Sequence, residues 1–120
     1  MDYATFPHSD YIQKGITVMS LRSSYEREIE ELKKQIVELE EDKADCLESI
    51  NKLQKRIDEA IKIALSTSNA TRSKAKKKLA EDLNKRFSKE KEHLAKTEKH
   101  LAEKHKALFE KETKLKKISA

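Results

Sequence analysis

The stretch IEELKKQIVELEEDKADCLESINKLQKRI, residues 29–57, decides the fold of this chain. Its apolar residues recur at alternating intervals of three and four. This is the heptad pattern of a coiled coil, in which positions a and d face a partner helix. The stripe, which we call the predicted seam of the first helix, comprises Tyr25, Ile29, Leu32, Ile36, Leu39, Cys46, Ile50, Leu53 and Ile57. Lys43 takes one a position, where a polar residue can fix register. The pattern predicts an acidic heptad helix over residues 21–65.

The overall composition agrees with long helices. The chain has 120 residues, and its single glycine and single proline both lie within the first fifteen. Charged residues make up 41% and hydrophobic residues 36%. A chain that lacks turn-forming residues and apolar material is typical of coiled coils rather than of α/β or all-β folds. It also has too little apolar material to enclose a dry pocket. We therefore expect no enzyme, no cofactor and no small-molecule substrate.

A second, basic helix is predicted over residues 74–118, with a less regular pattern. Large apolar residues recur every seven positions, at Phe87, Leu94, Leu101, Leu108 and Leu115. The complementary position is polar in its middle, for example at Glu90, Thr97 and Lys104. One apolar residue per heptad buries too little surface for stable self-association, so this helix needs the first helix as a partner.

The interruption between the two predicted helices is the polar segment STSNATRS, residues 66–73, in which Thr71 or Ser73 is a candidate N-cap. Equal helices on either side of one loop favour an antiparallel hairpin, in which residue i lies near residue 139 − i. The match is imperfect, because Lys55 and Arg56 would then face Lys85 and Arg86. The predicted fold is all-α, an antiparallel hairpin that can dimerise. The alternative is an extended parallel dimer through the first helix.

Charge is distributed unevenly along the chain. Residues 1–60 carry 9 Lys or Arg and 14 Asp or Glu, whereas residues 61–120 carry 18 and 8. The predicted basic patch comprises Arg72, Lys74, Lys76, Lys77, Lys78, Lys85 and Arg86. Such a patch suits phosphate contacts, although Phe87 is the one aromatic residue close to it, which argues against base stacking.

The first twenty residues are predicted to form a tail or a short helix, and residues 119–120 a C-terminal tail. Three aromatic residues, Tyr3, Phe6 and Tyr11, are candidates for docking to a partner. No run is apolar enough to span a membrane or to serve as a secretory signal. We therefore expect an intracellular protein, in the cytoplasm or alternatively in the nucleus.

Metal chemistry is not expected, because none of the four histidines lies three or four residues from another. Two classes of function follow. The first is a non-enzymatic scaffold or adaptor that binds proteins and self-associates, most simply as a dimer. The alternative is an accessory protein that binds nucleic acid through its basic second half.

Overall fold

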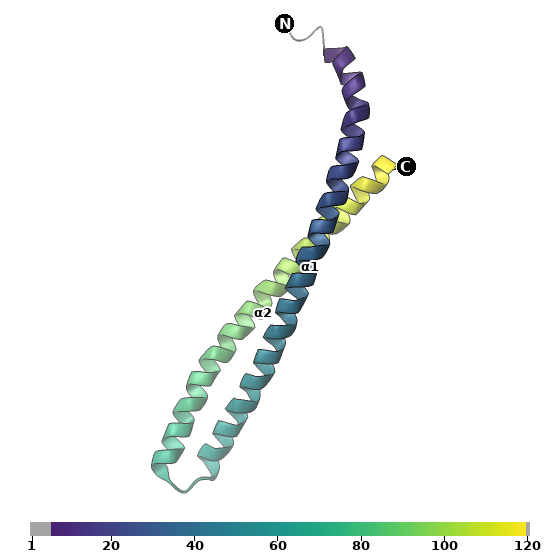
Figure 1. Cartoon of the computed structure of the whole chain (residues 1–120). Helices are drawn as coiled ribbons and strands as arrows, with labels where there is room; N and C mark the ends of the chain where they lie inside the picture. The colour runs from purple at the N-terminus through teal and green to yellow at the C-terminus, as the bar shows by residue number, and fades with distance from the viewer. Residues whose placement is uncertain (1–5, 120) are drawn as a thin grey trace. The chain divides into compact units, whose positions relative to one another are not determined.

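The computed structural model describes residues 6–119, with side chains described from Met19 onward. It consists of two helices, α1 (Phe6–Ser66) and α2 (Ala70–Ser119), which are joined by residues 67–69 (Figure 1). The helices pack against each other and run in opposite directions. This confirms the predicted all-α antiparallel hairpin. The extended chain that the alternative requires is not the arrangement of this structure, in which α2 folds back along α1.

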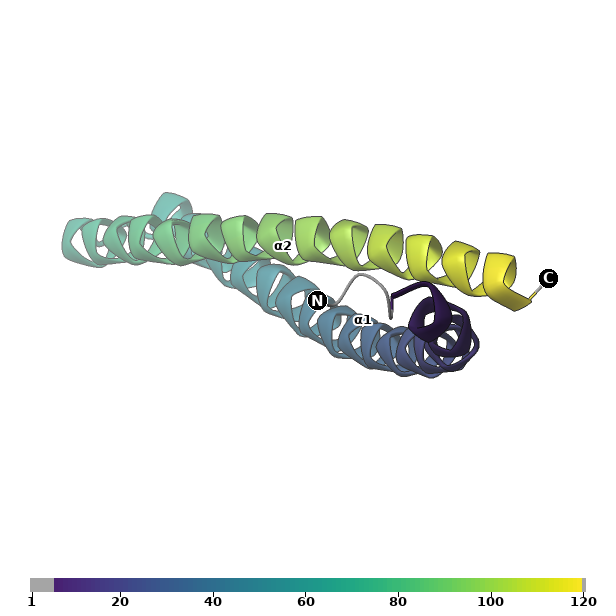
Figure 2. The same ribbon diagram turned by 90° about the horizontal axis from the view of Figure 1, so that it is seen from above.

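The hairpin divides into two units, each made of one piece of α1 and one piece of α2. The first unit takes the chain up to Val37 and from Ala102 onward, and the second is Glu38–Leu101, which contains the turn. The two helical pieces of the second unit lie side by side on either side of the turn (Figures 1 and 2).

The core of the second unit lies between its two helices. Leu83 of α2 is only 2% exposed and packs with Leu53 and Ile57 of α1, and the half-buried Phe87 lies against this cluster. Nearer the turn the buried residues are small, namely Ala60, Ala64 and Ala80. Because these side chains come from both helices, the apolar stripe of α1 is covered by α2 of the same chain.

The first unit has a mixed apolar and polar interface. Ile29 is buried there, and Lys111 of α2 reaches across to α1. The Lys111 ammonium lies 2.9 Å from Glu28 Oε2 and 5.2 Å from the centre of the Tyr25 ring. The hydrogen bond that the Lys111 ammonium donates to the Glu28 carboxylate raises the pKa of Lys111 above its ordinary value. A lysine can thus occupy a seam position, because its aliphatic stem is long enough to place the charged ammonium group at the edge of the helix interface.

All fourteen residues of the two predicted stripes are at least partly covered. Six are buried: Ile29, Ile36, Cys46, Leu53, Ile57 and Leu101. Eight are half-buried: Tyr25, Leu32, Leu39, Ile50, Phe87, Leu94, Leu108 and Leu115. The heptad register therefore identifies the faces along which the helices meet. That these residues also join two copies of the chain stays a prediction.

The turn is shorter than the predicted loop over residues 66–73. Asn69 is the N-cap of α2, because its Oδ1 accepts a hydrogen bond of 3.0 Å from the Arg72 backbone N–H. Ser73, a predicted N-cap, instead lies inside α2, where its hydroxyl donates to the Ala64 carbonyl oxygen over 2.7 Å. Thr71, the other candidate, also lies inside α2. No described residue has a positive φ, which explains how the chain reverses without glycine.

The start of α1 also differs from the prediction. The helix begins at Phe6 rather than at residue 21. Pro7 lies in its first turn, where a missing backbone N–H removes no helical hydrogen bond. Of the three candidate docking residues, Tyr3 lies outside the described residues. Phe6 and Tyr11 belong to α1, but their side chains are outside the described part of the structure.

We predict that Leu83→Ala lowers the free energy of unfolding by about 2–4 kcal/mol, since it removes a buried side chain and leaves a cavity. Urea denaturation followed by circular dichroism at 222 nm measures this change. The control is Met19→Ala, which truncates a side chain that is 74% exposed. It should stay within about 0.5 kcal/mol of the unaltered chain. Equal losses in the two variants would contradict the described core.

Candidate functional site

Positive charge is concentrated where the hairpin turns. Residues 50–89, which we call the basic tip, carry twelve Lys or Arg and four Asp or Glu. The rest of the second unit, residues 38–49 and 90–101, carries four Lys or Arg and nine Asp or Glu. The second unit is therefore positive at its turn and negative at its other end. A field of this kind attracts anions to the tip.

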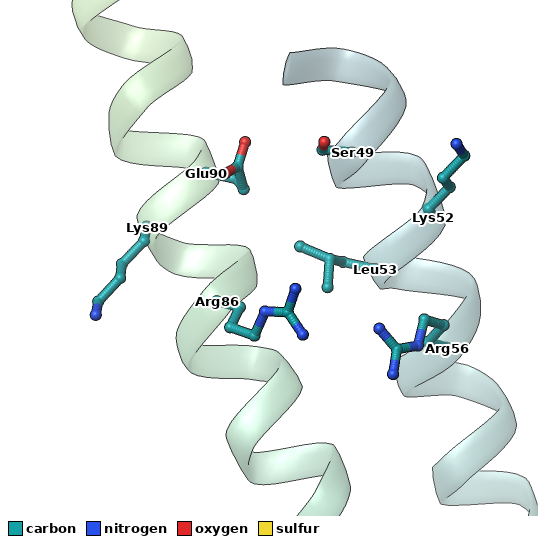
Figure 3. A pocket seen from close by; sticks show the side chains of 7 residues that line it. All are labelled: Ser49, Lys52, Leu53, Arg56, Arg86, Lys89 and Glu90. Carbon is teal, nitrogen blue, oxygen red and sulfur yellow. The ribbon is translucent and has the colours of Figure 1, made fainter. Parts of the chain in front are cut away.

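A shallow hollow of about 450 Å³ lies between the helices in this unit. Its floor includes the buried Leu53, and two arginines, Arg56 of α1 and Arg86 of α2, lie on either side (Figure 3). Their guanidinium groups point toward one another across the gap, whereas Lys52 and Lys89 extend away from it. Ser49 and Glu90 complete the lining. The hollow thus brings two fixed positive charges together from opposite helices.

The two arginines are exposed, and neither makes an ion pair or side-chain hydrogen bond within the part of the chain that the structure describes. Elsewhere in this unit the helices place a basic side chain of one helix beside an acidic side chain of the other. His93 Nε2 lies 3.7 Å from Asp42 Oδ2, and Lys43 Nζ lies 3.8 Å from Glu98 Oε2. At the hollow, by contrast, two side chains of like charge, Arg56 and Arg86, face each other across the seam.

The predicted basic patch lies in the first turns of α2, with six of its members exposed and Lys76 half-buried. The structure places Arg86, one of these seven residues, beside Arg56. The hairpin register predicts that Lys55 and Arg56 lie opposite Lys85 and Arg86, as a like-charged mismatch between the helices. Lys52, Arg56 and Lys89 were not predicted as site residues. The like-charged pairing was the signal that could have identified them.

Cys46, at a d position of the seam, is buried against Glu90. Its Sγ lies 3.1 Å from the Glu90 carbonyl oxygen and 3.4 Å from a Glu90 carboxylate oxygen. Burial, followed by the Glu90 hydrogen bond and the negative charges of Glu90 and Asp42, raises the pKa of the thiol above its ordinary 9.0. A protonated, covered thiol is a poor nucleophile. Cys46 therefore fills the seam and hydrogen-bonds there.

The described side chains contain no cluster of three or more His, Cys, Asp or Glu able to hold a metal ion. Within the described helices, no stretch is long and apolar enough to cross a membrane. The hollow between Arg56 and Arg86, which brings charged groups of both helices together, is thus the candidate site.

No family model matches this chain, and no curated protein or solved structure is significantly similar to it.

We predict that the Cys46 thiol reacts with an aromatic disulfide reagent at least about tenfold more slowly in the folded hairpin than in 8 M urea at pH 8. The raised pKa also sets a pH dependence. Above pH 9.0 the unfolded state releases the thiol proton, whereas the folded state still keeps it. The contribution of the thiol to the free energy of unfolding is therefore fully present below pH 9.0 and declines as the pH rises above that value.

The difference in urea stability between the unaltered chain and Cys46→Ala, followed from pH 7 to pH 10, isolates this contribution from lysine titration. The difference should shrink as the pH rises. Glu90→Gln is the matched control for the neighbouring charge, and it should speed the thiol reaction. A folded thiol that reacts as fast as the unfolded one would contradict the buried position.

Proposed function

We propose that this chain is a non-enzymatic coiled-coil scaffold or adaptor that self-associates and binds other proteins. The observation that carries the proposal is the set of large apolar side chains that remain exposed outside the seam. Large hydrophobic side chains remain exposed at Met19, Leu21, Val37, Leu47, Ile61, Leu65, Leu79 and Phe109. Exposed apolar side chains that gather on one side of a helix are typical of surfaces that contact a partner.

Three of these residues share one side of α1 in the second unit. Leu47 and Ile61 both follow a d position, two heptads apart, and Leu65 lies one helical turn beyond Ile61. Because residues four and seven apart lie on the same face of a helix, they form an incomplete outer stripe. Polar residues, including Gln54 and Asp58, interrupt it. An incomplete stripe supports weak, reversible association better than a permanent interface.

A second copy of the chain is the partner that the charges favour. The second unit is basic at its tip and acidic at its other end, so two copies placed in opposite directions would set unlike charges against each other. Such an arrangement would join two hairpins into a four-helix bundle. We place this scaffold inside the cell, in the cytoplasm, or in the nucleus if its basic half meets nucleic acid.

We predict that the unaltered chain sediments as a dimer at about 100 µM, and that the double variant Ile61→Asp and Leu65→Asp sediments as a monomer. Charges on this stripe cost burial free energy in the dimer but not in the single hairpin. Sedimentation velocity measures the mass, and circular dichroism checks that the helices remain.

The matched control adds the same charges at exposed positions on the other side of the seam, with Ser66→Asp and Ala75→Asp. This variant should remain dimeric. A monomeric unaltered chain would overturn self-association. A covalent dimer formed through Cys46 under mild oxidation would instead favour the parallel coiled coil, because that arrangement places two d-position thiols face to face.

The exposed basic patch favours one further candidate function, that of a nucleic-acid accessory protein. Its cations lie in the first turns of α2, and residues of α1 such as Lys62 add to the same tip. The few aromatic residues nearby offer no platform for stacked bases. Binding would therefore depend on the phosphate backbone and be insensitive to sequence.

We predict that a fluorescent 20-base-pair duplex binds the chain and loses affinity steeply between about 50 and 200 mM salt, because each neutralised phosphate releases counterions. Fluorescence anisotropy at several salt concentrations gives the slope. The absence of binding at 50 mM salt, or an affinity that does not change with salt, would remove this candidate function.

A further inference from the structure

We infer that Arg56 and Arg86 form a binding site for a phosphate group in the hollow between the helices. This site extends the proposed nucleic-acid function. It depends on that function only if the bound phosphate belongs to a nucleic acid. It is independent of self-association. Its first support is convergence, because the two guanidinium groups point toward one another from different helices (Figure 3).

The second support is the electrostatic cost of leaving the hollow empty. In an antiparallel coiled coil, g positions of the two helices flank the same side of the seam, and they commonly carry opposite charges. Arg56 and Arg86 both occupy g positions in the registers of their helices. Two cations that repel each other, with no ion pair among the described residues, are stabilised by an anion placed between them.

The third support is the chemistry of the donors. A guanidinium presents planar N–H groups that match the oxygens of a phosphate two at a time, and two guanidiniums can hold one phosphate from both sides. Ser49 adds a hydroxyl to the lining, while Lys52 and Lys89 add charge at the rim. Glu90 also lines the hollow, but its carboxylate lies against the Cys46 thiol. The balance of charge in the hollow is thus strongly positive.

The chain offers an internal control for a direct test, since it has five arginines in total. Each arginine side chain gives one Nε–H signal in a ¹H–¹⁵N NMR spectrum. Inorganic tripolyphosphate, added to the full chain, should shift the signals of Arg56 and Arg86 in a saturable manner. The signals of Arg22 and Arg27, which lie outside the basic tip, should move little. Equal movement of all five signals would show general ion screening and overturn the site.

The double variant Arg56→Gln and Arg86→Gln should weaken tripolyphosphate binding by about tenfold or more, measured by calorimetry. The matched control, Arg22→Gln and Arg27→Gln, removes the same two charges in the first unit and should change the affinity less than about twofold. Tripolyphosphate should also raise the unfolding temperature of the unaltered chain and of the control, but not of the site variant.

The source of the phosphate is decided by repeating the titration with the duplex. Weaker duplex binding by the site variant than by the control assigns the hollow to a nucleic-acid backbone. Tripolyphosphate binding without duplex binding keeps the site and removes the nucleic-acid function. Duplex binding that is equal in both variants, with no response of Arg56 or Arg86 to tripolyphosphate, removes the site and keeps the function. Equal binding of a glutamate peptide would overturn the specificity for phosphate.

Discussion

The packing of Leu83 between Leu53 and Ile57 is the contact on which the rest of the hairpin depends. Alone, α2 carries one large apolar residue per heptad, and a helix of that composition gains little from its own packing. Against α1, the same residues acquire a continuous partner face. The basic tip exists as an ordered surface only because this contact holds both helices in place near the turn. Folding and the positioning of charge are therefore consequences of one interface.

The polar seam residues of α2 explain why the helices meet as a hairpin. In a parallel pair of α2 helices, each seam residue would face its own copy, so Glu90 would meet Glu90 and Lys111 would meet Lys111. Such like-charged pairs in a seam are costly. In the hairpin, Glu90 meets a thiol and Lys111 meets Glu28. The polar residues thus contribute little apolar burial, but they disfavour a parallel pairing of α2 with its own copy.

Equal helices on either side of one loop predicted the antiparallel direction. The heptad pattern was sufficient to predict the seam, because burial along a helix follows a fixed period. It did not predict the turn, since Ser, Thr and Asn over residues 66–73 can all cap a helix, and the choice of Asn69 depends on closing the chain reversal. It also did not show the hollow. Which of Lys55 and Arg56 turns inward depends on how the two helices are rotated against each other.

The outer apolar stripe of α1 and the hollow between Arg56 and Arg86 lie on different sides of the seam. Leu47 and Ile61 occupy e positions of α1, whereas Arg56 occupies g, and these positions flank the seam on opposite sides. A second copy seated on the outer apolar stripe would therefore leave the arginine hollow open. Self-association would then present two identical anion sites in one particle. Two linked sites hold a polyanion more tightly than either does alone, because the second contact is intramolecular. A scaffold role and a phosphate-binding role are therefore compatible, and dimerisation would strengthen the binding of a polyanion.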